Sequence, residues 1–107
     1  MPINKVDDHF AQSSQLTPED VRLIAEAGYK AIVCARPDNE DAGQPAFADI
    51  ATVAERFGIK AFHIPVSGPL PEGQLIRFAQ AKSETNGPIF GYCRSGGRAG
   101  SLYKATL

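Results

Sequence analysis

One short stretch near the end of the chain combines the residue types of a nucleophilic anion site. Cys93 follows the apolar run IFGY (89–92), and Gly96, Gly97 and Arg98 come shortly after it. If the apolar run is a buried strand and a helix begins after Arg98, the backbone N–H groups of the intervening loop can converge on an anion. The sequence therefore predicts a site for a thiolate and its oxyanion substrate.

The residues around Cys93 favour its thiolate form and the binding of a negatively charged substrate. A thiol is mostly protonated at neutral pH, but a helix N-terminus and nearby guanidinium groups stabilise the thiolate. The fork of Arg98 can hold two oxygens of a sulfonate or phosphate, and glycines let successive N–H groups point inward. Cys93 and Arg98 are therefore the predicted catalytic residues. The predicted substrate-binding residues are Arg94, Ser95, Gly96, Gly97 and Ala99.

The two cysteines have different surroundings and different expected roles. Cys34 lies inside an apolar run with no adjacent cation or glycine, so we expect it to fill the core, with a resolving thiol as the alternative. For Cys93 the alternative is a small buried residue that merely follows a strand. The paired glycines and the arginine beside Cys93 favour the catalytic interpretation.

The composition is that of a single globular domain. The chain has 107 residues, of which 43% are hydrophobic and 21% charged, with a formal net charge of −1. Such a length supports one core and not two, so we expect one domain over residues 1–107. The chain has no basic patch for a nucleic acid, and no apolar segment fit for a membrane span or a secretory leader. We expect a cytoplasmic protein with free thiols.

Apolar periodicity and turn residues predict alternating helices and strands. Helices are expected where apolar residues recur at helical spacing and end at glycine or a turn. Short continuous apolar runs indicate strands that are covered on both faces of a parallel sheet. The predicted helices cover residues 18–27, 47–57, 72–83 and 99–107, and the predicted strands cover 30–35, 61–66 and 89–92, with one or two short edge strands within 4–15.

This alternation predicts a three-layer α/β fold in which helices flank a mostly parallel central sheet. Ligands of such sheets bind beyond the carboxyl ends of the strands. The loops at that edge are residues 36–44, 67–71 and 93–98. We therefore expect these three loops to form one pocket.

Two family resemblances enter at these loops. The segment YCRSGGR (92–98) resembles the active-site loop of rhodaneses. The order of RPD (36–38), HIPV (63–66) and the Cys93 loop resembles the phosphatase-like domain of the beta-lactamase hydrolase-like family, over nearly the whole chain. That resemblance implies a fold of the dual-specificity-phosphatase type. It also implies, as a partner, a metallo-beta-lactamase-like persulfide dioxygenase, which occurs fused to or beside members of this group.

The Cys93 loop departs from the pattern of protein phosphatases with this fold. Those enzymes have five residues between cysteine and arginine and usually a histidine before the cysteine, whereas here four residues intervene and Tyr92 precedes Cys93. They also need an acid to protonate the leaving oxygen, and the loop SGPLP (67–71) contains none. These three departures favour transfer of sulfur over hydrolysis of a phosphoester.

Other polar residues near the expected pocket are expected either to assist the reaction or to stabilise the fold. Arg36 and Asp38 are candidate auxiliary residues, and Asp38 or Asp41 is a candidate replacement acid. The alternative for these carboxylates is a solvated acidic loop. His63 is expected to be a hydrogen-bonded structural residue, because the few candidate ligands around it do not supply a zinc site. We expect neither a metal nor another cofactor.

Three hypotheses for function follow from the sequence. The leading one is a rhodanese-type sulfurtransferase that carries sulfane sulfur from thiosulfate or a low-molecular-weight persulfide as a Cys93 persulfide. Its leaving groups are stable anions, so it needs no strong general acid. The alternative is a cysteine-dependent phosphatase that forms a phosphocysteine at Cys93. A third hypothesis is a non-catalytic module that binds an anion or a persulfide for a partner enzyme.

Overall fold

The structure, a computed structural model, describes residues 3–107 and contains one five-stranded sheet with the order β1-β2-β5-β3-β4. The strands are β1 (Ile3–Lys5), β2 (Phe10–Ser13), β3 (Ala31–Cys34), β4 (Lys60–His63) and β5 (Ile89–Tyr92). The helices are α1 (Pro18–Glu26), α2 (Phe47–Arg56), α3 (Glu72–Glu84) and α4 (Gly97–Ala105). Strands β2 to β5 are mutually parallel where they pair, and only β1 is antiparallel to its neighbour.

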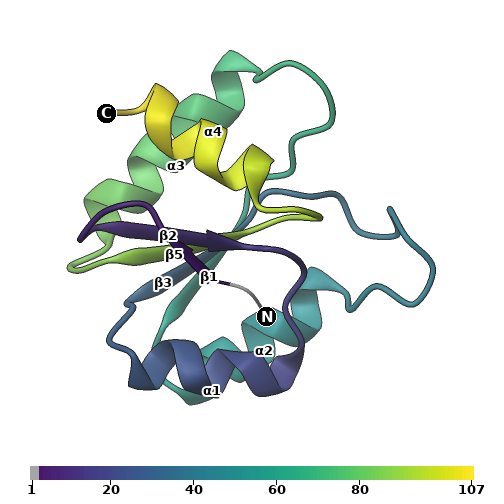
Figure 1. Ribbon diagram of the computed structural model, residues 1–107, viewed down its shortest axis with the longest axis vertical. Helices are drawn as coiled ribbons and strands as arrows, with labels where there is room; N and C mark the ends of the chain where they lie inside the picture. The colour runs from purple at the N-terminus through teal and green to yellow at the C-terminus, as the bar shows by residue number, and fades with distance from the viewer. Residues whose placement is uncertain (1–2) are drawn as a thin grey trace.

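The sheet is the middle of three layers. Helices α3 and α4 cover one face, and α1 and α2 cover the other (Figure 1). The core on the α3/α4 face contains Phe10, Phe78 and Leu102, all fully buried. The core on the other face contains Ile24, Ile32 and Ile50. The predicted α/β architecture with a mostly parallel sheet and flanking helices is therefore confirmed.

The structure refines the predicted elements at three places. Only β1 lies at a sheet edge in the first segment, because β2 pairs in parallel with β5 and is interior. Strand β4 ends at His63, ahead of Pro65, because proline lacks the N–H that a sheet ladder requires. Helix α4 begins at Gly97, two residues before the expected start at Ala99. Arg98 therefore belongs to the first turn of a helix.

Close packing of α4 on the sheet depends on Gly91 in the middle of β5. A Cβ atom at this position would lie 2.7 Å from Cζ of Phe10 and 2.9 Å from Cβ of Ala99. Real Cβ atoms do not approach other heavy atoms so closely, so a side chain here would push the helix away. The glycine thus lets the first turn of α4 pack against the strand that precedes Cys93.

The loops that follow β3, β4 and β5 emerge at the same edge of the sheet, on the right in Figure 1. This is the arrangement predicted from the parallel strand order. Within residues 3–107, no helix is long and apolar enough to span a membrane.

Candidate active site

Cys93 is the first residue after β5, and a backbone N–H of its loop contacts its sulfur. The side chain is fully buried. Its own N–H donates to the carbonyl of Ser13 at the end of β2, with an N–O distance of 3.3 Å. The N–H of Gly96 donates to Sγ of Cys93 at 3.0 Å. One backbone donor of the predicted loop is therefore aimed at the sulfur.

Gly96 caps α4 in a conformation that favours glycine. Its φ of 99° lies in the left-handed region, where a side chain meets steric strain. A Cβ atom would also lie 3.4 Å from the backbone of Ser13. This conformation directs the N–H of Gly96 back to Cys93, so the residue that begins the helix also completes the loop around the sulfur.

Arg98 lies in the first turn of α4 and forms a bidentate ion pair with Glu40. Its Nη1 donates to Oε2 at 2.9 Å, and its Nη2 donates to Oε1 at 2.6 Å. Nη1 also donates to the carbonyl of Val66 at 2.7 Å. These contacts join the loops after β3, β4 and β5 at this edge of the sheet.

Arg36, predicted as an auxiliary residue, is the buried anchor of this network. Only 2% of its side chain is exposed. Its three nitrogens donate to Glu40 Oε1 at 3.1 Å, to Gln15 Oε1 at 3.0 Å and to Asp41 Oδ2 at 2.8 Å. A buried guanidinium is stable only when its donors are satisfied in this way.

Arg94 takes part in the same network from the solvent side. Its Nε lies 3.2 Å from Asp41 Oδ2, and 66% of its side chain is exposed. Exposed pairs of this kind contribute little to stability, so Arg94 can turn toward a ligand at low cost. The structure thus brings Arg94, Arg98 and Arg36 together around two carboxylates.

The charges in this network shift the pKa of both members of the central pair. The hydrogen bond from Arg98 is the main cause that lowers the pKa of Glu40 below its usual range. The same bond raises the pKa of Arg98, and the nearby Cys93 adds to this rise. Glu40 is therefore an ionised partner of Arg98 at neutral pH and does not hold a proton for a leaving group.

Asp38, one of the two candidate replacement acids, has a structural role in this conformation. Oδ1 of Asp38 accepts a hydrogen bond from the N–H of Phe47 at 2.8 Å, at the start of α2. His63 lies against the same segment: its ring stacks on Phe47, and Nε2 is 2.8 Å from the carbonyl of Arg36. The structural interpretation of His63 fits these contacts.

The remaining predicted binding residues divide by exposure. Ser95 and Gly97 are exposed on the loop and at the start of α4. The side chain of Ala99 is fully buried in the core on the α3/α4 face. For Ala99, therefore, only the backbone can serve a ligand, as the prediction of converging N–H groups assumes.

Cys34 lies on the opposite face of the sheet from Cys93. It pairs in register with Tyr92, and both side chains belong to the core under α1 and α2. Because side chains alternate along a strand, Cys93 points to the other face, where it joins the second core. Burial raises the pKa of the Cys34 thiol. Cys34 is a core residue, and the sheet separates it from Cys93.

Glu40 was not singled out in the sequence, although two arginines of the site depend on it. The available signal was its spacing of four residues from Arg36 within an acidic loop at the binding edge of the sheet. That spacing alone does not identify Arg98 as a partner, because the two residues are far apart in the chain. The contact between Glu40 and Arg98 depends on how the loops after β3 and β5 fold together.

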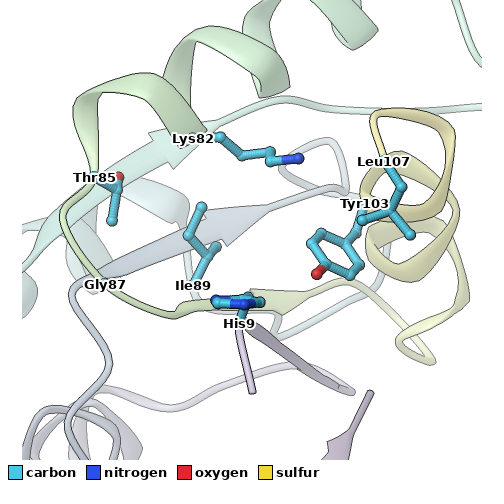
Figure 2. A pocket seen from close by; sticks show the side chains of 7 residues that line it. All are labelled: His9, Lys82, Thr85, Gly87, Ile89, Tyr103 and Leu107. Carbon is cyan, nitrogen blue, oxygen red and sulfur yellow. The ribbon is translucent and has the colours of Figure 1, made fainter. Parts of the chain in front are cut away.

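A pocket of about 470 Å³ lies elsewhere, at the end of β5 opposite to Cys93 (Figure 2). Its lining includes His9, Lys82, Ile89 and Tyr103. Figure 2 shows Ile89 and His9 between Thr85 on one side and Tyr103 on the other. The pocket contains no cysteine, so it is not the site of the predicted chemistry.

No metal centre is present among the residues that the structure describes: these contain no group of three or more His, Cys, Asp or Glu side chains that could hold an ion.

Comparisons with known proteins agree with this geometry. Residues 3–106 match the family described as "Beta-lactamase hydrolase-like protein, phosphatase-like domain". A beta-lactamase hydrolase-like protein of Agrobacterium fabrum is 34% identical over 100 residues, which cover 92% of this chain and 23% of that protein. One from Xylella fastidiosa is 32% identical over 104 residues, or 96% of this chain and 24% of that protein. The chain thus spans about a quarter of these relatives.

Solved structures show the same fold. A protein of Neisseria meningitidis described as a candidate phosphatase is 38% identical, with a TM-score of 0.83, and the match covers 96% of this chain and 74% of that one. A candidate phosphatase of Shewanella putrefaciens matches with a TM-score of 0.82 at 16% identity, over 97% of this chain and 66% of that one. With its family match, its fold and its Cys93 loop in agreement, the chain belongs to the phosphatase-like domains of the beta-lactamase hydrolase-like family.

Proposed function

We propose that this domain is a cysteine-dependent phosphatase that acts through a phosphocysteine at Cys93. The observation that carries the proposal is the Cys93 loop itself: a buried sulfur that accepts the N–H of Gly96, with Arg98 in the adjoining helical turn. The family and its solved relatives support phosphate as the substrate group. They favour the alternative from the sequence over the leading hypothesis of sulfur transfer.

In the proposed reaction the Cys93 thiolate attacks the phosphorus of a phosphoester. The S–P bond forms as the P–O bond breaks, and the electron pair leaves with the oxygen. Backbone N–H groups of the loop and the guanidinium of Arg98 stabilise the charge on the other phosphoryl oxygens. Water then attacks the phosphocysteine, which releases phosphate and restores the thiolate.

The surroundings of Cys93 restrict the leaving group. Glu40 is ionised beside Arg98, Asp38 accepts a bond from the start of α2, and Asp41 pairs with Arg36. No carboxyl group of this loop is left to protonate a departing oxygen. We therefore expect aryl phosphates, whose leaving group is a stable anion, to react much faster than alkyl phosphates.

The same observation favours sulfur transfer as a second candidate. When the thiolate attacks the sulfane sulfur of thiosulfate, the S–S bond breaks and sulfite leaves with the electron pair, so no acid is required. The Cys93 persulfide would then pass its sulfur to cyanide or a thiol. A persulfide dioxygenase as partner belongs to this second candidate and stays a prediction.

One pair of measurements separates the two candidates. Hydrolysis of para-nitrophenyl phosphate is measured with the wild type and with Cys93→Ser, and intact mass is measured after incubation with thiosulfate. The phosphatase proposal expects hydrolysis that Cys93→Ser abolishes. A cyanide-sensitive adduct of one sulfur atom on Cys93, with no hydrolysis, would overturn it in favour of sulfur transfer. Phosphate binding with neither activity would indicate the non-catalytic module.

A further inference from the structure

We infer that Glu40 is a positioning residue, which orients the guanidinium of Arg98 so that the edge not bound by Glu40 faces Cys93 and the oxyanion held there. This inference rests on the proposed function, since it concerns how the same site holds a phosphoryl group. The role of Glu40 follows from its contacts with Arg98 and Arg36 in this chain.

Three N–H groups of Arg98 donate hydrogen bonds to Glu40 and Val66. A guanidinium has five N–H donors. Both N–H groups of Nη1 donate, one to Glu40 and one to Val66, and one N–H group of Nη2 donates to Glu40. Among residues 3–107, no further oxygen atom accepts from the N–H of Nε or from the second N–H of Nη2, and a side-chain hydrogen bond with Cys93 adds to the rise in the pKa of Arg98. These two donors share one edge of the guanidinium and match two oxygens of a tetrahedral anion.

Hydrogen bonds of its side chain and of its backbone keep Glu40 itself in place. Its Oε1 accepts from Arg98 and also from Nε of the buried Arg36, at 3.1 Å. Its backbone N–H donates to Gln44 Oε1 at 3.1 Å, and Gln44 in turn donates to the carbonyl of Pro37. Glu40 is thus fixed by its own loop and by a side chain in the core.

Arg98 lies between Glu40 and the nucleophile Cys93. Only 24% of the Arg98 side chain and 26% of the Glu40 side chain are exposed, so water screens this pair less than a fully exposed one. Cys93 is close enough to add to the rise in the pKa of Arg98. The carboxylate therefore holds one side of the guanidinium while the other side faces the Cys93 loop.

A competing role would be a latch, in which Glu40 occupies Arg98 in place of the substrate. A latch would have to leave when the anion binds, which would break its contacts with Arg98 and Arg36 together. The edge of Arg98 not bound by Glu40 makes such release unnecessary. The two roles predict opposite effects on anion binding, which makes them separable by experiment.

The test uses inorganic phosphate as the probe, with binding measured by calorimetry on the full chain. In Glu40→Gln we expect phosphate to bind about tenfold to a hundredfold more weakly, the size of effect seen when a charged hydrogen-bond partner is lost. In an Arg98→Ala background the same substitution should have little further effect, because Glu40 acts through Arg98. Equal or tighter binding by Glu40→Gln, or an equal loss in both backgrounds, would overturn the inference.

A side-chain NMR signal gives a readout that a merely structural role would not move. The Nε–H of Arg98 should give a sharp signal in the wild type and a broadened one in Glu40→Gln, while the fold is unchanged by circular dichroism. If Glu40→Gln does not fold, Glu40→Asp serves instead, because its shorter carboxylate cannot span both arginines and should also weaken phosphate binding. A sharp Arg98 signal in the folded variant would contradict the inference.

The control is Glu26→Gln, which removes a carboxylate from the exposed Arg22–Glu26 pair on α1. It should leave phosphate binding and the Arg98 signal unchanged. The inference and the proposed function fail in different ways. Phosphate binding that depends on Glu40, without any Cys93-dependent hydrolysis, would refute only the function, while hydrolysis and binding that ignore Glu40 would refute only the inference. A wild type that binds no phosphate would refute the inference as well.

Discussion

Gly96 has the most demanding backbone conformation in the Cys93 loop. With φ at 99°, an alanine would be strained and would lose the orientation of the N–H that contacts Cys93. We expect Gly96→Ala to lower the free energy of unfolding by about 1–2 kcal/mol, the cost of a left-handed residue with a side chain. Hydrolysis by Cys93 should fall by a larger factor than stability alone explains.

The matched control is the neighbouring Gly97→Ala. Gly97 has no positive φ, and the nearest atom to a Cβ there is Oγ of Ser95 at 3.7 Å. Chemical denaturation should show a stability close to that of the wild type for this variant. If both alanine variants were equally stable and active, the Gly96 conformation would not be required.

Cys34 is buried on the face of the sheet opposite to Cys93. Because the sheet separates it from Cys93 and burial raises the pKa of its thiol, Cys34 should neither resolve nor replace the nucleophile. We expect Cys34→Ala to keep its Cys93-dependent activity, with a stability loss of about 1 kcal/mol from the small cavity. Mass spectrometry after mild oxidation should find no disulfide between the two cysteines in the folded wild type.

The sequence could predict the nucleophile but not the full set of its neighbours. Cys93, Gly96 and Arg98 are close in the chain, so their chemistry follows from a strand, a turn and a helix start. Glu40 and Val66 meet Arg98 only because three separate strands end at one sheet edge. Which side chains touch across such an edge depends on loop conformation, which sequence patterns do not determine.

At the scale of elements, the placement of α4 depends on how closely it approaches β5. Gly91→Ala would put a Cβ within 2.7 Å of Phe10 and 2.9 Å of Ala99, so the helix must shift. We expect a loss of about 1–3 kcal/mol, typical of overpacking, together with reduced activity because Arg98 moves with the helix. Denaturation and hydrolysis assays on the same variant measure both effects.

Gly73→Ala in the first turn of α3 is the corresponding control. No atom lies within 4 Å of a Cβ built at that position. Alanine is also the better helix former, by up to about 1 kcal/mol. This variant should be as stable as the wild type or more so, and a loss similar to that of Gly91→Ala would argue against the close-packing explanation.

A hydrogen bond between Tyr103 and Asp7 links α4 to the turn after β1. The hydroxyl donates to Oδ2 at 2.6 Å, and burial with this bond raises the pKa of Tyr103 to about 12. The contribution of this hydrogen bond to the free energy of unfolding is complete below the ordinary tyrosine pKa of about 10. It is lost as the pH rises through the pKa of Tyr103 in the folded protein. Tyr103→Phe should therefore lose less stability across this alkaline range than the wild type, as urea titrations can show. Equal losses would contradict this assignment.

Most elements could be predicted because apolar period and turn residues agree along the chain. The structure confirms each predicted helix and the three later strands to within a few residues. The place of β2 between β1 and β5 was not predictable in the same way. The partner of β2 is the last strand in sequence, and a mixed polar segment carries no signal for such a distant pairing.

For the whole molecule, the two cores should melt as one. Strands β2, β3 and β5 contribute side chains to both faces, so loss of one core removes the support of the other. We expect coincident urea transitions by circular dichroism and tyrosine fluorescence. Ile50→Val, on the α1/α2 face, should lower stability by about 0.5–1.5 kcal/mol and move both transitions equally. Separate midpoints for the two probes would show that the faces unfold independently.

The strand order has a consequence for synthesis on the ribosome. Within residues 3–107, β5 is the last strand of this sheet in chain order, yet it lies at the centre and alone joins the β1-β2 pair to the β3-β4 pair. Until residues 89–92 leave the exit tunnel, the nascent chain has two unjoined half-sheets with exposed inner edges. Such edges invite non-native pairing. A chain stalled before Ile89 should therefore be held by chaperones or degraded, and the nucleophile is placed in the same event that closes the sheet.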